Sequence, residues 1–270
     1  MSLISKTKIQ YEKNGYIIIK NLLDQDLINK CLSTIKNLPP KVLVPFSEEA
    51  WGFGSLDEHK PFDEVNKKIL NTIKSLEILD KNIKLNYLIC NRKPGWIGPS
   101  VHYHQEVLLS KTFASGASHS YLRNKLMQVY LPLHSETSSN GGLRVITNTH
   151  KLDALESEDM ICPQFGHKKR IKNKILDLLI QSDEHQLIDV NLEAGDCLLF
   201  SLFLVHASPS NGLPGERVSI VSQAKPIDFE PDQKIFKEDT DFRKSFVVEE
   251  LSKISKKIMD PSRYMEFNKK

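Results

Sequence analysis

Short β-rich runs separated by turn-forming residues fill the middle of the chain, and they constrain the fold more than any other feature. They recur from residue 84 to residue 225 and are punctuated by Gly, Pro, Asn and Ser. The clearest runs are residues 85–90, 127–133, 142–147, 197–203 and 218–223. Strands this short and this frequent are typical of a β sandwich or barrel. The sequence therefore predicts a mainly β core.

Helical patterns flank this core. Asp24 precedes an apolar stripe at helical spacing that stops before Pro39, and residues 62–79 repeat the pattern. Residues 168–181 are also amphipathic, which predicts a helix inserted between strands, with the basic residues 167–170 as its solvated start. Residues 242–259 predict a C-terminal helix that covers the core.

The chain contains no internal repeat and no Pro/Ser-rich linker. We therefore expect a single domain over residues 1–270. Its N-terminal helices fall within residues 1–80, its β core within about 84–226 and its C-terminal helix within about 236–260.

Composition narrows the classes of partner. Thirty-seven Lys and Arg residues against 34 Asp and Glu residues give a formal net charge of +3, too small for the electrostatic footprint of a nucleic-acid or anionic-membrane binder. No apolar run approaches the ~18 residues that span a bilayer, and no secretory segment opens the chain. The cysteines are few and widely spaced, as expected for reduced thiols: Cys31, Cys90, Cys162 and Cys197. We expect a cytoplasmic protein that binds neither nucleic acid nor membrane.

Two His-x-Glu pairs are candidates for metal binding, because residues two apart on a strand point the same way. They are His104 with Glu106 and His134 with Glu136. Non-haem iron enzymes use two imidazoles and one carboxylate on one face of the metal, and leave positions open for co-substrate and oxygen. About one such pair is expected by chance in a chain of this composition. Spacing alone does not choose between the two.

A second histidine and an arginine follow near the end of the β core. His206 comes after an apolar strand that begins at a Gly195-Asp196 turn, and Arg217 lies eleven residues further on, at the head of the next β-rich run. This order can place a metal ligand and a guanidinium in one pocket. The planar fork of an arginine grips a carboxylate with two hydrogen bonds, as a dicarboxylic co-substrate such as 2-oxoglutarate requires.

In these motifs the chain resembles the phytanoyl-CoA dioxygenase family of Fe(II)/2-oxoglutarate oxygenases, which includes ectoine hydroxylase. The resemblance spans roughly residues 11–226, in order and with similar spacing. Four segments carry it: the opening at residues 11–22, Tyr103-His104-Gln105-Glu106, the Asn140-Gly141 run that ends in Thr149-His150-Lys151, and residues 195–217.

The resemblance implies a double-stranded β-helix, also called a jelly roll. It assigns His104, Glu106 and His206 to Fe(II), which makes His134 and Glu136 the end of a strand. It also implies that Arg217 binds the far carboxylate of 2-oxoglutarate, with Ser208 assisting and Asn91 as a further contact.

The implied activity is hydroxylation of a C–H bond of a small molecule, with consumption of O2 and release of succinate and CO2. The substrate and the oligomeric state are left open. Two positions depart from the family pattern, since Glu106 replaces the commoner Asp and Thr149 replaces Ser. The carboxylate of Glu106 disfavours halogenation, because related halogenases lack it.

Two other classes compete with an oxygenase. A cupin-type metal protein shares the β-helix, and His102-Tyr103-His104 offers its His-x-His pair. Leu108, however, stands where cupins usually have an acid. A family member with an inactive site that acts as a binding protein is the other alternative, and intact ligands with Arg217 argue against it.

Overall fold

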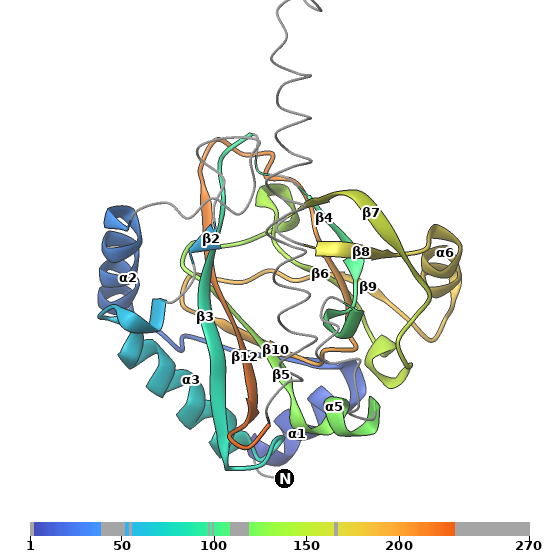
Figure 1. Cartoon of the computed structure of the whole chain (residues 1–270), viewed down its shortest axis with the longest axis horizontal. Helices are drawn as coiled ribbons and strands as arrows, with labels where there is room; N and C mark the ends of the chain where they lie inside the picture. Colours follow the sequence, from blue (N-terminus) through green and yellow to red (C-terminus); the bar gives the residue numbers. More distant parts are fainter. Residues whose placement is uncertain are drawn as a thin grey trace, which may run out of the picture.

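The structure is a computed structural model that describes residues 3–38, 52–53, 56–96, 98, 100–108, 119–164 and 167–229. The predicted C-terminal helix lies outside these residues. The chain folds around two antiparallel sheets (Figure 1). Six strands form the larger sheet, in the order β1 (Tyr16–Ile19), β10 (Cys197–Phe200), β5 (Met127–Pro132), β12 (Arg217–Pro226), β3 (Ile83–Lys93) and β2 (Gly52–Phe53). Four form the smaller one, in the order β4 (Val101–His104), β11 (Val205–Ser208), β6 (Arg144–Ile146) and β9 (Leu187–Asp189).

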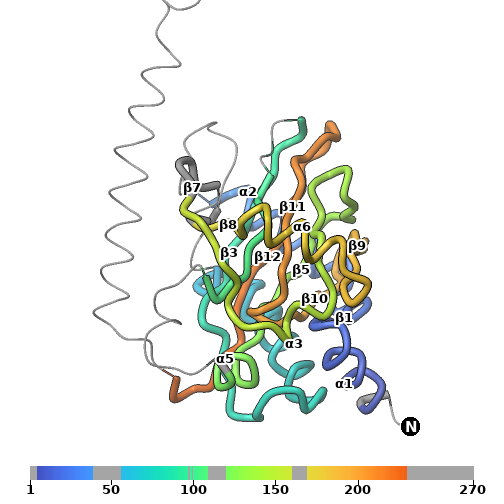
Figure 2. The backbone as a smooth tube through the Cα atoms, turned by 90° about the vertical axis from the view of Figure 1, so that its right-hand side faces the viewer, coloured from blue at the N-terminus to red at the C-terminus, as the bar shows by residue number. Residues whose placement is uncertain are grey.

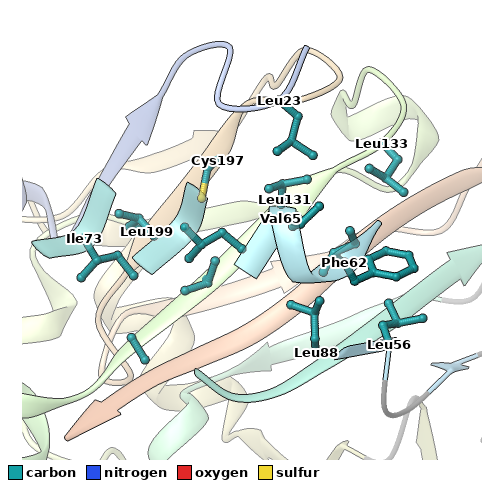
Figure 3. Close-up of a cluster of buried hydrophobic side chains, with 14 of the residues drawn as sticks. Leu23, Leu56, Phe62, Val65, Ile73, Leu88, Leu131, Leu133, Cys197 and Leu199 are labelled. Atoms are coloured by element: carbon teal, nitrogen blue, oxygen red, sulfur yellow. The ribbon is translucent and has the colours of Figure 1, made fainter. Parts of the chain in front are cut away.

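Helices cover the outer face of the larger sheet. Figure 1 shows α2 (Gln25–Asn37) and α3 (Phe62–Leu76) on one side of the strands. The buried side chains of α3 pack onto β3, β5 and β10, where Figure 3 shows Phe62 and Val65 among Leu88, Leu131 and Leu199. The side chain of Asp24 accepts a hydrogen bond from the backbone of Leu27 and caps α2, as predicted.

Side chains on the strands of the larger sheet point alternately to its two faces, so that they contribute to two separate hydrophobic cores. Residues 88 and 90 of β3 point to the helices, whereas Lys93 and its neighbours two apart point to the smaller sheet. A second apolar cluster fills the space between the sheets and includes Tyr130, Val145, Leu198 and Phe200. This arrangement confirms the predicted fold, a mainly β jelly-roll core with flanking helices.

The N-terminal segment belongs to the larger sheet as well as to the helical cover. α1 (Leu3–Asn14) leads into β1, which pairs with β10 at one edge of the molecule (Figure 2). The carboxylate of Asp196, at the start of β10, accepts hydrogen bonds from the side chain of Lys20 and the backbone of Asn21. The buried Asp196 in the Gly195-Asp196 turn therefore anchors the end of β1.

The predicted helix over residues 168–181 is wrong in its first part. β7 (Ser157–Gln164) and β8 (His167–Ile171) form a two-stranded sheet, and α6 (Asn173–Gln181) follows. Arg170 pairs with Glu158 and Lys169 with Asp159 across this sheet. The basic run is thus a strand, because a segment ten residues earlier supplies cross-strand partners that helical periodicity cannot reveal.

Among the described residues, no helix combines the length and the apolar character needed to cross a bilayer.

Candidate active site

Neighbouring strands of the smaller sheet bring two histidines next to each other, with their rings tilted by 53°. His206 of β11 is the register partner of His104 of β4, and their ring centroids lie 4.2 Å apart. Glu106 opens the short 3-10 helix η2 (Glu106–Leu108) just after β4. Its Oε1 atom lies 3.3 Å from Nε2 of His206 and 3.7 Å from Nε2 of His104. The three residues form one group, here called the metal group, whose ligand atoms lie within 4.8 Å of one another.

The backbone fixes the tautomers of both histidines. Nδ1 of His104 donates to the carbonyl of His102 at 2.7 Å, and Nδ1 of His206 donates to the carbonyl of Leu204 at 2.9 Å. A carbonyl can only accept, so Nδ1 carries the proton in each neutral ring and Nε2 presents a lone pair. Two imidazole lone pairs and a carboxylate then converge on one point, a donor set that repels itself unless a cation sits among its atoms.

The protonation states suit metal binding. Burial lowers the pKa of His104, and the neighbouring His206 lowers it further, so the neutral imidazole is favoured. Burial raises the pKa of Glu106, but the nearby rings of His104 and His206 outweigh this effect and hold that pKa well below its usual value. Metal binding requires neutral histidine and ionised glutamate, and these are the states favoured for His104 and Glu106.

Two buried polar side chains, Thr149 and Gln105, form hydrogen bonds to the backbone close to the metal group. Thr149 donates its hydroxyl to the carbonyl of Ile146 and accepts the backbone N–H of Val205, next to His206. Gln105, between the two ligands of the His-x-Glu pair, donates to the carbonyl of Phe203 and accepts from the backbone of Leu155. Thr149 stands where the family usually has serine, and its bridge uses the hydroxyl group that threonine and serine have in common.

Arg217 lies on the inner face of the larger sheet and is 3% exposed. Its Nη1 donates to the hydroxyls of Tyr130 and Ser219 and, at 3.0 Å, to Oε1 of Glu136. The hydroxyl of Tyr130 donates in turn to the Glu136 carboxylate. Nε of Arg217 is buried and has no hydrogen-bond partner among the described residues. The chain therefore satisfies Nη1 of the guanidinium but leaves Nε without a partner among the described residues.

The structure places the other predicted residues as follows. The hydroxyl of Ser208 donates to the carbonyl of Gly141 and accepts from Nζ of Lys93. Asn91 is half-buried on β3, in register with Ser219, which contacts Arg217. His134 and Glu136 lie outside the metal group, and Nδ1 of His134 accepts the backbone N–H of Val218.

Sequence reasoning missed two buried charged residues of this region, Glu136 as the partner of Arg217 and Lys93 as the partner of Ser208. Glu136 was visible as half of the second His-x-Glu pair, but its contact with Arg217 spans 81 positions. Nothing in the sequence indicated a role for Lys93, except that it lies just after a β-rich run. We call Arg217, Glu136, Tyr130, Ser219 and Lys93 the cation cluster.

A jelly roll with two histidines and a carboxylate that converge between its strands defines the class of non-haem metal enzymes with a facial triad. The family comparison agrees: the model for phytanoyl-CoA dioxygenase (PhyH) matches residues 11–218. The chain belongs to the phytanoyl-CoA dioxygenase family. No curated protein sequence matches it.

Solved structures share the fold at low sequence identity. The epimerase SnoN of nogalamycin biosynthesis, in complex with Fe3+, alpha ketoglutarate and nogalamycin RO, superposes with a TM-score of 0.63 at 12% identity, over 82% of this chain and 83% of its own. HygX from Streptomyces hygroscopicus, with nickel and 2-oxoglutarate bound, gives 0.60 at 12% identity, over 84% and 89%. EvdO2 from Micromonospora carbonacea, complexed with 2-oxoglutarate, gives 0.62 at 10% identity, over 87% and 96%.

Proposed function

We propose that this protein is an Fe(II)- and 2-oxoglutarate-dependent oxygenase that hydroxylates a C–H bond of a small molecule. The observation that carries the proposal is the convergence of His104, Glu106 and His206 on one point. Membership of the phytanoyl-CoA dioxygenase family supports it, as do neighbours of the same fold solved with 2-oxoglutarate bound.

In this proposal His104 and His206 bind Fe(II) through Nε2, and Glu106 binds it through its carboxylate. When bound, Fe(II) and 2-oxoglutarate supply the oxidising chemistry, in which the 2-oxo acid gives succinate and CO2 and one oxygen atom of O2 goes to the substrate. The protein's part is to hold these groups in place and to exclude water.

The unpartnered Nε of Arg217 fits the far carboxylate of 2-oxoglutarate. A guanidinium edge that is buried without a partner is costly, and a carboxylate satisfies it with a charge-assisted hydrogen bond. Ser208 connects this end to the metal group, since it lies two residues after His206, about 7 Å along β11. Because its hydroxyl is already bonded to Gly141 and Lys93, Ser208 assists by holding Lys93 and the strand in place.

The test is turnover of 2-oxoglutarate by purified protein reconstituted anaerobically with Fe(II) and then exposed to O2. We expect succinate to form even without the substrate, at the slow uncoupled rate. His206→Ala should abolish it, because the remaining two ligands bind the metal weakly.

The matched control is His102→Ala, which removes an exposed imidazole from the same strand as His104. This variant should keep its metal and its turnover. Equal activity in the wild type and His206→Ala would refute the ligand assignment, and wild-type protein that binds neither Fe(II) nor Mn(II) anaerobically would favour an inactive binding protein.

Hydroxylation is tested separately, by the mass of the product. Hydroxylation adds one oxygen atom to the substrate, whereas epimerisation, the activity described for SnoN, adds none. A product with unchanged oxygen content would still be consistent with an Fe(II)- and 2-oxoglutarate-dependent enzyme, but it would contradict hydroxylation.

A further inference from the structure

Arg217, which we propose to bind the co-substrate, already forms a buried ion pair with Glu136. Glu136 is completely buried as a side chain, and its carboxylate accepts from Nη1 of Arg217 and from the hydroxyl of Tyr130. The guanidinium and the carboxylate together carry no net charge. A second carboxylate that arrives at Nε of Arg217 would leave one uncompensated negative charge in a buried site, which is strongly unfavourable.

Lys93 is the cation that can offset this charge. It is the register partner of Arg217 across β3 and β12, so the two side chains leave the same face of the sheet. It is 1% exposed, and it is coupled electrostatically to both Arg217 and Glu136.

The contacts of Lys93 fit the ammonium form. Its Nζ lies 2.6 Å from Oγ of Ser208, 3.3 Å from the carbonyl of Ser208 and 2.5 Å from the carbonyl of Pro209. The hydroxyl of Ser208 already donates to Gly141, so at Lys93 it accepts. Three acceptors match the three N–H donors of an ammonium, whereas a neutral amine has only two.

The surrounding backbone leaves space for this lysine. Gly141 has a φ of +83°, and a Cβ there would lie 3.0 Å from Cδ and 3.2 Å from Nζ of Lys93. A Cβ on Gly98 would lie 2.8 Å from Cβ of Lys93. Burial lowers the pKa of Lys93 well below its usual value and Arg217 lowers it further, whereas Glu136 raises it. A second carboxylate at this end would act in the same direction as Glu136.

We propose that Lys93, rather than Arg217 alone, supplies the positive charge that selects a dicarboxylic 2-oxo acid, and that Glu136 weakens the binding of that acid by occupying Arg217. Arg217 orients the distal carboxylate, while Lys93 and Glu136 set the charge that it meets. This inference rests on the proposed function, because it requires 2-oxoglutarate to bind with its far carboxylate at Arg217.

The experiment compares two probes on Mn(II)-loaded protein by anaerobic calorimetry. 2-Oxoglutarate carries the distal carboxylate, and 2-oxopentanoate has the same five-carbon chain with a methyl group in its place. The variants are Lys93→Met, Glu136→Gln and the double variant. The amide introduced by Glu136→Gln keeps an oxygen acceptor for Arg217, so this variant changes charge with little change in shape.

We expect Lys93→Met to weaken 2-oxoglutarate binding by ~10-fold or more and to leave 2-oxopentanoate binding unchanged. Glu136→Gln should tighten 2-oxoglutarate binding about tenfold, and the double variant should return towards the wild type because the charges balance again. The rise in melting temperature that 2-oxoglutarate causes should likewise be larger in Glu136→Gln than in the wild type.

Equal loss for both acids in Lys93→Met would reduce Lys93 to a structural residue and overturn the inference. Weaker or unchanged 2-oxoglutarate binding in Glu136→Gln would overturn it as well, and this arm decides alone should Lys93→Met not fold. Failure of the proposed function looks different, since the wild type itself would then bind neither acid in a metal-dependent way.

Discussion

The metal group and the cation cluster are held in place by different means. At the metal group, each histidine is fixed by a hydrogen bond to a carbonyl two residues earlier on its own strand. At the cation cluster, Arg217 contacts the nearby Ser219, but its other contacts and those of Lys93 are with residues 81 to 116 positions away in the sequence. The orientation of each imidazole is therefore set locally, although two strands bring the rings together, whereas the cation cluster is held by contacts across the assembled sheets. Loss of a metal ligand should therefore affect metal binding more than stability, whereas loss of Glu136 should affect stability more than metal binding.

The largest contrast is expected between the two acids, Glu106 and Glu136. Glu106→Ala should lower the affinity for Mn(II) by more than ~100-fold, because a direct ligand matters more than the surrounding hydrogen bonds. Its free energy of unfolding should hardly change, since the carboxylate has no buried arginine to neutralise.

Glu136→Ala should do the reverse. Removing it leaves Arg217 as an unpaired buried charge, which costs about 3–5 kcal/mol of unfolding free energy. Metal titration and urea unfolding of both variants measure the two effects. Loss of the metal only in Glu136→Ala would exchange the roles of the two His-x-Glu pairs.

A smaller effect is expected for Arg217→Lys. Lysine keeps the positive charge but lacks the fork that contacts Glu136 on one edge and a ligand on the other, so 2-oxoglutarate affinity should fall by ~10–100-fold. Metal affinity should stay unchanged, as measured by Mn(II) titration in the absence of co-substrate. Unchanged 2-oxoglutarate affinity in this variant would exclude a guanidinium clamp.

The smallest effect concerns Thr149, whose hydroxyl bridges the carbonyl of Ile146 and the backbone of Val205. Thr149→Val leaves that buried N–H without its partner and should cost about 1–3 kcal/mol of unfolding free energy. Because Val205 precedes His206, a modest drop in metal affinity should accompany it. Thr149→Ser is the matched control, and it should behave like the wild type. A Thr149→Val variant as stable as the wild type would show that this bridge contributes nothing.

The same contrast explains what the sequence could predict. The His-x-Glu spacing indicated the pairing of His104 with Glu106, although β4 ends at His104 and Glu106 opens η2 instead of continuing the strand. The family motifs supplied His206. Periodicity could not distinguish Glu136 from Glu106, because the partner of Glu136 comes from a strand 81 positions further on. The strand over residues 167–171 was missed for the same reason, since Glu158 and Asp159 pair with it across the hairpin. Helix α2 was predicted correctly because its cap and its apolar stripe are both local.

A crystal structure of the protein grown anaerobically with Fe(II) and 2-oxoglutarate would test the central claim most directly. We expect one metal ion bonded to Nε2 of His104, Nε2 of His206 and the carboxylate of Glu106, with the far carboxylate of the co-substrate against Nε of Arg217. A metal ion bound without these three side chains, or a co-substrate that leaves Arg217 untouched, would contradict it.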